Sequence, residues 1–380
     1  MRGAMKFSRR HMLLGPLALG LAGLPGALVA AKPQRASAAY TGQDRRRAIE
    51  RGLRFIHATA RVPANFALYG DDYLWCFTTI ANTSADPALS ALARRMGLER
   101  AAAWRRLHPR VPADAAAEDV ASLAYAAHAT NLLGLADARR HADLQRAAAG
   151  FAANAFLDFD PAHELPPADL PATCVRCSSG NDRGVKQCAT CGGALEMRSP
   201  YAVLMDALTT TYVGDRYGIR LGASFPQVAG LIPRMRPYRG FEGGANAEFL
   251  ATAYAVTHVV YTLNDYGSWR LKPEWLPQEF AFLKANLEAS IALEDPESLG
   301  EFVDTLKAFG VTDDDPLIRA GIDYLMASQN RDGSWGHVES EDIYERYHPT
   351  WTAIDGLRDF AFKGERVSFP AALQAAGGPE

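Results

Sequence analysis

Residues 319–335 read RAGIDYLMASQNRDGSW, and this stretch decides how the rest of the chain is interpreted. Apolar residues recur at helical spacing over about 316–328, and a glycine-containing turn then leads to Trp335. Residues 312–316 (TDDDP) precede the pattern, and residues 349–354 (PTWTAI) follow the turn and open a second helical pattern. The spacing predicts two helices that pack against each other across a short connection.

Over about residues 313–362 the chain resembles the repeat of the squalene-cyclase and prenyltransferase superfamily. The resemblance rests on the spacing of the QW motif, which is reproduced by Arg319, Tyr324, Leu325, Gln329, Asn330, Gly333 and Trp335. A fainter echo over residues 47–56 is similar to the opening of the same repeat. The resemblance implies an α/α toroid, with an inner ring of helices inside an outer ring and a pocket at the mouth of the inner ring. In that family the motif residues brace helix ends, so they imply fold and not chemistry.

The rest of the chain is dominated by Ala-rich helical patterns, without a convincing alternating strand series. These patterns lie at about 45–60, 86–106, 117–133, 136–157, 200–213, 246–264, 277–292, 297–309 and 350–361. The predicted fold class is therefore all-α. We expect an α/α toroid over residues 39–380, interrupted by a small zinc-ribbon insertion at 172–195.

The first 38 residues have the layout of a secretory signal. A positive start precedes an apolar segment with several glycines, and Ala36-Ser37-Ala38 supplies the small residues that a signal peptidase reads. The alternative is a membrane span, which would need about 20 strongly apolar residues. Ser8-Arg9-Arg10-His11-Met12 resembles the twin-arginine pattern. It implies export by the twin-arginine machinery to the periplasm or beyond, with no integral span after processing.

Charge argues against nucleic acid or an anionic membrane surface as a partner. The chain has 40 basic and 43 acidic residues, for a net charge of −3. Six of the basic residues and none of the acidic ones lie in the signal, so the mature chain carries 34 against 43, or −9. The roughly 342 mature residues are enough for one large core or for two smaller domains.

The strongest chemical motif is a pair of Cys-x-x-Cys knuckles, formed by Cys174, Cys177, Cys188 and Cys191. Four thiolates at this spacing suit one tetrahedral zinc ion, and a site closed by four cysteines is structural. Two disulfides are an alternative for an exported protein, and a redox iron site is another. Cys76 lies between Trp75 and Phe77, so it is either a buried apolar residue or a reactive thiol.

A polar face on an otherwise apolar helical segment supplies the first candidate catalytic residues. Tyr254, His258, Tyr261 and Asp265 lie at i, i+4, i+7 and i+11, and they share one side of a helix over about 248–265. His258 is suited to proton transfer at neutral pH, and Tyr261 or Asp265 would orient it. The alternative is a core histidine packed between two tyrosines.

Two further candidates come from other segments. Tyr347-His348-Pro349 follows the motif turn, and in the resembling family this position opens an inner helix, so His348 would line the pocket. Prenyltransferase β chains have a zinc-binding histidine at a similar place, but the companion Asp-x-Cys is not recognisable here. Asp72, in Gly70–Trp75, is either a helix N-cap or a pocket carboxylate.

These residues leave two classes of function open. The first is an exported enzyme that uses general acid–base chemistry in a central pocket, of the cyclase or lyase type. Its substrate would be an isoprenoid-like molecule or a polysaccharide, held by nearby aromatic side chains such as Tyr73, Trp75, Tyr266, Trp269 and Trp351. The second is a non-catalytic ligand-binding or scaffold protein of the same fold.

Overall fold

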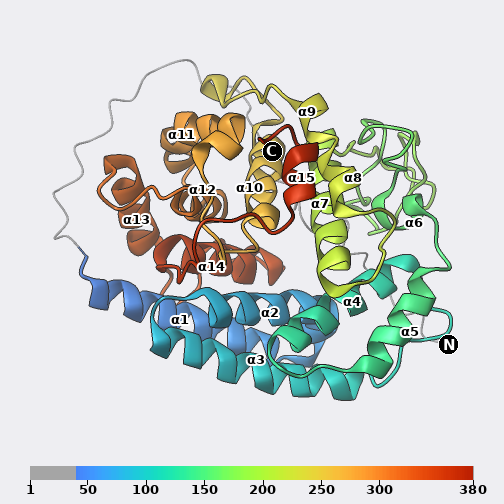
Figure 1. Cartoon of the computed structure of the whole chain (residues 1–380), viewed down its shortest axis with the longest axis horizontal. Coiled ribbons are helices and arrows are strands. Elements are labelled where there is room, and N and C mark those ends of the chain that lie inside the picture. Colours follow the sequence, from blue (N-terminus) through green and yellow to red (C-terminus); the bar gives the residue numbers. More distant parts are fainter. Residues whose placement is uncertain (1–39, 380) are drawn as a thin grey trace.

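The computed structural model describes residues 40–379, and over these residues the chain is all-helical, with isolated β-bridges but no strand (Figure 1). The α-helices are α1 (Gly42–Ala60), α2 (Pro63–Thr83), α3 (Pro87–Leu107), α4 (Ala117–Leu132), α5 (Ala138–Ala148), α6 (Ala153–Leu157), α7 (Pro200–Tyr217), α8 (Phe225–Ala229), α9 (Ile232–Met235), α10 (Phe249–Leu263), α11 (Pro277–Ala292), α12 (Pro296–Ala308), α13 (Pro316–Ser328), α14 (Tyr344–Leu357) and α15 (Pro370–Ala375). Two short 3₁₀ turns lie at Glu242–Gly244 and Pro273–Trp275. The predicted all-α class is confirmed.

The local sequence explains where four of the helices begin. A capping side chain is followed at once by proline at α3, α7, α12 and α13, and the caps are Asp86, Ser199, Asp295 and Asp315. Each cap accepts a hydrogen bond from a backbone N–H of the first turn, while proline at the next position lacks an N–H that would have no partner there. Asp315 thus has a structural role at the start of α13.

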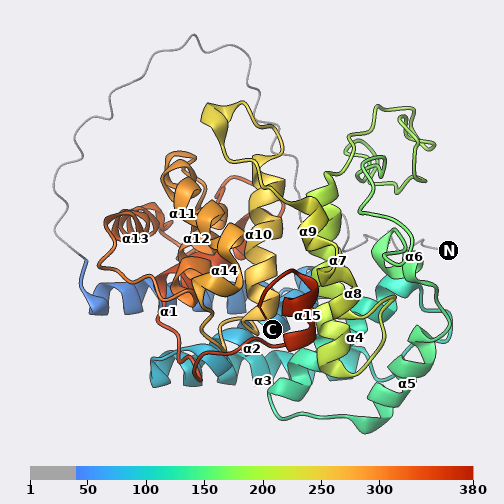
Figure 2. The same ribbon diagram turned by 45° about the horizontal axis from the view of Figure 1, so that its top comes forward.

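The helices α2, α4, α7, α10, α12 and α14 lie in the middle of the molecule, each packed against the next in this order. The first and last of them meet through aromatic rings, because Tyr73 of α2 and Tyr347 of α14 lie 4.5 Å apart. In Figure 1, α3 lies outside this set at the bottom and α5 at the lower right, whereas α11 and α13 lie outside it on the left. Turning the view separates the segment that precedes α7, which stands off from the helices (Figure 2).

Residues 319–335 connect the C-terminal part of the fold to helix α1 through hydrogen bonds. Gln329 donates a 2.8 Å hydrogen bond to the carbonyl of Ala48 in α1, and Arg51 of α1 donates back to the Gln329 side chain. Trp335 is fully buried and donates its indole N–H to the carbonyl of Leu325. These contacts hold α1 and α13 on either side of α14.

Several predicted helix boundaries agree with the structure to within one residue. The pattern at 277–292 matches α11 and the pattern at 316–328 matches α13. The pattern at 136–157 is wrong as a single helix, because the turn at Gly150 divides it into α5 and α6. Helix α14 begins at Tyr344, six residues earlier than predicted, and contains Pro349. The Glu345 carbonyl that proline leaves without its helical donor accepts from the His337 N–H instead.

Close contact between α12 and α14 depends on Gly300. A Cβ atom at this position would lie 2.5 Å from the backbone carbonyl of Thr352. Gly300→Ala is therefore expected to push the two helices apart and to lower the free energy of unfolding by about 3 kcal/mol. Gly70→Ala is the matched control, because a Cβ there meets only ordinary contacts at 3.6 Å with the Phe66 ring. Urea denaturation of both variants measures the difference, and equal stability would contradict this account of the packing.

No helix among residues 40–379 is long and apolar enough to cross a membrane. The predicted twin-arginine signal, residues 1–38, lies outside the described residues.

Candidate functional site

Two cavities lie among the central helices, and they share part of their lining. The larger, of about 110 Å³, is bordered mainly by α2, α4, α7, α10 and α14. The smaller, of about 40 Å³, is bordered by α2, α10, α12 and α14. Four residues line both cavities, namely His258, Tyr266, His348 and Trp351. The structure thus brings the two predicted histidines, which are 90 positions apart in the chain, to one place.

His258 lies in the middle of α10 and is held as a neutral base. Its Nδ1 lies 2.8 Å from the carbonyl of Tyr254, which accepts only, so Nδ1 carries the proton and Nε2 keeps its lone pair. Burial above all, together with the nearby positive charge of His348, lowers the pKa of His258 to about 4, against the opposing effects of that carbonyl and of Glu297. At neutral pH its Nε2 is a hydrogen-bond and proton acceptor.

His348 lies in the second turn of α14 and has the opposite protonation. Burial disfavours its charge, but nearby acidic groups, Glu297 above all and then Asp72, outweigh burial and raise the pKa of His348 to about 9. Nδ1 lies 3.1 Å from Glu297 Oε1, as an ion pair whose angle is poor for a hydrogen bond. The ring stacks on Tyr344 with centroids 4.8 Å apart. At neutral pH His348 is an imidazolium that can donate a proton.

The smaller cavity carries carboxyl groups that hold protons at neutral pH. Burial raises the pKa of Glu301 to about 8, despite a 2.5 Å hydrogen bond with the Thr257 hydroxyl. Burial, reinforced by Asp355, likewise raises the pKa of Asp304 to about 8. Burial also raises the pKa of Asp355, although Arg358 donates to it at 2.6 Å. Groups whose pKa values are pushed apart in one site are typical of acid–base catalysis.

The other predicted site residues are placed differently from one another. Tyr261 lines the smaller cavity, and burial followed by the nearby Asp304 carboxyl group raises the pKa of its hydroxyl well above the ordinary value. Asp72 lines the larger cavity and accepts a 3.0 Å hydrogen bond from the Tyr347 hydroxyl. The N-cap alternative for Asp72 is wrong, because the residue lies inside α2, three positions after a kink at Tyr69. Asp265 lines neither cavity. Asp265 lies in the turn that carries Tyr266, and it accepts hydrogen bonds from Tyr212 and Arg216 of α7.

Of the aromatic residues proposed for the rim, Tyr266 and Trp351 line both cavities. Tyr73 and Trp75 are buried core residues of α2 that line neither one. Trp269 lies under the cationic side chains of Lys363 and Arg366, and it also lines neither cavity.

Sequence reasoning missed the acidic residues of α12. Glu297, Glu301 and Asp304 lie at i, i+4 and i+7, the same spacing that singled out His258. Their neighbours Leu299, Phe302, Val303 and Leu306 are fully buried. An acidic face on a helix whose other large side chains are mostly apolar was therefore the signal that could have found them, since buried carboxyl groups need partners or water.

The protonated groups make stability depend on pH. The folded protein holds protons on Glu301 and Asp304 up to about pH 8 and on His348 up to about pH 9, whereas the unfolded chain releases them near 4.5, 3.8 and 6.5. Between pH 6.5 and 8 the folded state thus binds more protons at all three groups, so stability falls as pH rises.

We expect the free energy of unfolding to drop by on the order of 2–4 kcal/mol across this window. Chemical denaturation at a series of pH values measures the drop. Glu301→Gln with Asp304→Asn should flatten the curve, whereas Glu339→Gln, at an exposed position, should leave it unchanged. A parent curve that rises from pH 6.5 to 8 would overturn the assignment of these protons.

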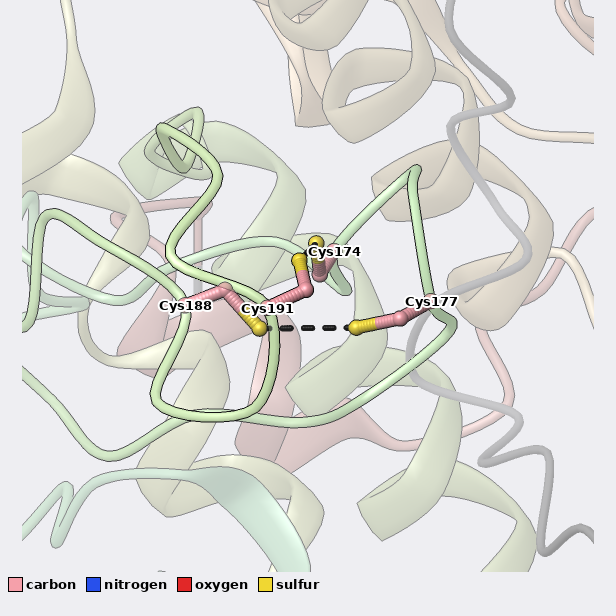
Figure 3. Close-up of side chains that lie close together, drawn as sticks. All are labelled: Cys174, Cys177, Cys188 and Cys191. Atoms are coloured by element: carbon pink, nitrogen blue, oxygen red, sulfur yellow. Dashed lines mark hydrogen bonds between the residues drawn. The ribbon is translucent and has the colours of Figure 1, made fainter.

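The four predicted cysteines form the second candidate site. Their sulfur atoms all lie within 4.8 Å of one another, and two pairs, Cys174–Cys191 and Cys177–Cys188, are 3.5 Å apart (Figure 3). Zinc–sulfur bonds of about 2.3 Å in a tetrahedron separate the sulfurs by about 3.8 Å. A disulfide needs about 2.05 Å. The cluster therefore fits a metal ion such as zinc.

The two knuckles have the same backbone conformation. The residue after each second cysteine, Ser178 or Gly192, has a positive φ, of 56° and 68°. Its N–H donates to the carbonyl of the first cysteine of the same knuckle, at 2.7 Å from Ser178 and 2.8 Å from Gly192. Figure 3 shows the four sulfurs of the two knuckles converging on one place.

The base of the cysteine segment is joined to the wall of the larger cavity. The backbones of Leu170–Ala172 and Glu196–Arg198 pair with each other through two 2.8 Å hydrogen bonds. The buried side chain of Arg198 then forms ion pairs with Asp158 and with Asp206, which lines the cavity.

Cys76 lies apart from this cluster, in the core of α2. It is fully buried, and burial raises the pKa of its thiol well above the ordinary range. Because the thiolate is the reactive form, this favours the buried apolar residue over the reactive thiol.

Comparisons of the chain with protein-family models, with curated proteins and with solved structures found no match.

Proposed function

We propose that this chain is an exported α/α-toroid enzyme that performs general acid–base chemistry in its central cavities. The observation that carries the proposal is the convergence of His258 and His348, with opposite protonation, on the same two cavities. A neutral imidazole and an imidazolium at one site supply a base and an acid at the same pH.

The toroid is supported by the order of helix packing. Helices α2, α4, α7, α10, α12 and α14 each pack against the next, and Tyr73 and Tyr347 bring the last back to the first. Helices α1, α3, α5, α11 and α13 alternate with them along the chain, except between α7 and α10, where the short α8 and α9 lie instead. The resemblance of residues 313–362 to the squalene-cyclase and prenyltransferase repeat points to the same arrangement.

In the proposed reaction, His258 Nε2 accepts a proton from the substrate. His348 donates a proton to the leaving group, or to the substrate atom whose bond is broken. Tyr261 lies beside Asp304 in the smaller cavity. The protonated carboxyl groups of Glu301 and Asp304, which line the same cavity as His258, are a further source of protons. Asp265 acts at a distance, because it fixes the turn that places Tyr266 against both histidines' cavities.

The lining of the cavities limits the classes of substrate that could bind. Among the lining residues of the larger cavity there is no Lys or Arg, and the Arg358 of the smaller one is paired with Asp355. The one cationic group that an acidic polysaccharide would meet among the other lining residues is His348, which is already paired with Glu297. A volume of about 110 Å³ is below the roughly 150 Å³ of an apolar cavity that binds benzene, so the site takes a small group or one end of a longer molecule.

The test is turnover of a panel of isoprenoids, neutral oligosaccharides and acidic polysaccharides by the mature protein, followed by a pH profile of kcat/KM. We expect activity that is constant between limbs near pH 4 and pH 9, the values at which His258 gains and His348 loses its proton. His348→Gln should remove the alkaline limb. No turnover of any compound would favour a ligand-binding or scaffold protein of the same fold.

The cysteine cluster is proposed to hold one structural zinc ion. All four ligands are thiols, so no position is open for a substrate, and the ion would fix the fold of residues 172–195. Uptake of zinc in the cytoplasm, before export by the twin-arginine route, is compatible with ligands that remain reduced.

A further inference from the structure

The larger cavity has a negative lining. Four carboxyl side chains border it, Asp71 and Asp72 from α2, Glu118 from α4 and Asp206 from α7. The one cationic side chain in the lining is His348, whose own partner is Glu297, and Arg198 stands behind Asp206. Acidic groups thus outnumber cations at this cavity, and a bound cation would be attracted to it.

Aromatic rings form much of the remaining lining. Tyr69, Tyr125, Tyr266, Tyr344 and Trp351 border the same space, contributed by α2, α4, α14 and the turn after α10. The face of an aromatic ring attracts a cation within about 6 Å, and several rings around one space are typical of sites for alkylated ammonium groups.

Tyr344 adds an observation that is independent of the acidic residues. It lines the cavity, it is only 5% exposed, and its hydroxyl has no hydrogen-bond partner among the described residues. A buried hydroxyl without a partner is destabilising, and a polar ligand in the cavity would satisfy it. A ligand with a hydroxyl beside its cationic group would suit both features.

We infer that the larger cavity binds the head group of a small organic ammonium ion, held by the carboxylates of Asp72 and Glu118 and by the surrounding aromatic rings. This inference deepens the proposed function and rests on it for the identity of the pocket. The ammonium ion would be the substrate or the part of the substrate that anchors it, which leaves the histidines to act on an adjoining bond.

Calorimetric titration with choline and with 3,3-dimethylbutan-1-ol tests the inference. The two compounds have the same shape and differ in the charge of one atom, and acetate serves as an anionic control. We expect choline to bind the mature protein at least about tenfold more tightly than its neutral isostere, and acetate not to bind. Equal affinity for choline and the isostere, or absence of choline binding, would overturn the inference.

Variants that keep side-chain size separate charge from packing. Asp72→Asn and Glu118→Gln should each weaken choline binding by about tenfold and leave binding of the neutral isostere unchanged, whereas Glu339→Gln should change neither. Since Glu118 is partly exposed in the first turn of α4, its variant folds even where Asp72→Asn does not. Unchanged choline binding in a folded Glu118→Gln protein would contradict the assigned role of that carboxylate and overturn the inference.

Choline binding and substrate turnover test the ammonium site and the acid–base proposal separately. Choline binding without turnover of any compound would sustain this inference and remove the acid–base proposal. Turnover of a neutral substrate that depends on His258, without choline binding, would sustain the enzyme and remove the ammonium site.

Discussion

Replacing Cys174 by serine is expected to abolish metal binding, from about one zinc per chain to none, and to unfold residues 172–195. The apparent binding free energy of structural zinc in small sites is about 10–16 kcal/mol at neutral pH, and it stabilises the folded segment. Loss of one of the four thiolates removes much of this binding free energy. The segment has little else to hold it, because Cys174 and Cys188 are its buried sulfurs and it contains no helix. Metal content by mass spectrometry and proteolysis within 172–195 measure both effects.

The helical body should survive this substitution. The main hydrophobic core is formed by the helices and includes none of the four cysteines. Helical circular dichroism is therefore expected to stay near that of the parent. Val175→Ser is the matched control, since Val175 lies in the same knuckle, is 70% exposed and contributes no sulfur. Two disulfides and no metal in the parent protein would refute the zinc proposal.

Replacing His258 by alanine is expected to reduce turnover by about 10²–10⁴-fold, the usual contribution of a positioned general base. Its melting temperature should stay close to the parent value. The side chain borders two cavities, so its removal enlarges a space that already exists. The Tyr254 carbonyl, which loses the Nδ1 proton, keeps the hydrogen bond of the α-helix.

His128→Ala is the matched control for this experiment. His128 is a buried core histidine that packs between Trp75 and Tyr217 and lines neither cavity. Its loss should lower the stability by about 1–3 kcal/mol and leave turnover unchanged. If His258→Ala instead shows the behaviour expected of His128→Ala, with lower melting temperature and full activity, His258 is a packing residue and the acid–base proposal fails.

Most of the longer helices, outer and central, could be predicted from sequence because their periodicity is local. Helix α13 begins at an Asp-Pro pair and has one apolar face, and α11 begins at Pro277, so pattern and flanking residues agree. Helix α2 was not among the predicted helical patterns, and the N-cap interpretation of Asp72 would have begun a helix well after the observed start at Pro63. Helix α2 is buried on nearly every side, from Phe66 to Thr83, and a helix without a polar face has no 3.6-residue alternation to detect.

The candidate site could be predicted only in part. The polar positions of α10 were visible as one face of a helix, and His348 followed from the resemblance of its segment. The equivalent pattern in α12 was overlooked. Asp265 was expected beside His258 on the same helix face, but α10 ends at Leu263 and the chain turns, so that its carboxylate points to Tyr212 and Arg216.

The sequence by itself determined what depends on neighbours along the chain. Helical periodicity predicts the all-α class, and two Cys-x-x-Cys pairs eleven residues apart are enough to place four sulfurs in one cluster, because each knuckle is a local turn. Tertiary structure alone decided which histidines meet and which protons they carry. Packing of α10, α12 and α14 brings Glu297 to His348 and leaves His258 without a carboxylate at hydrogen-bond distance. Since burial and nearby charge set a pKa, two identical side chains become a base and an acid only once the helices have assembled.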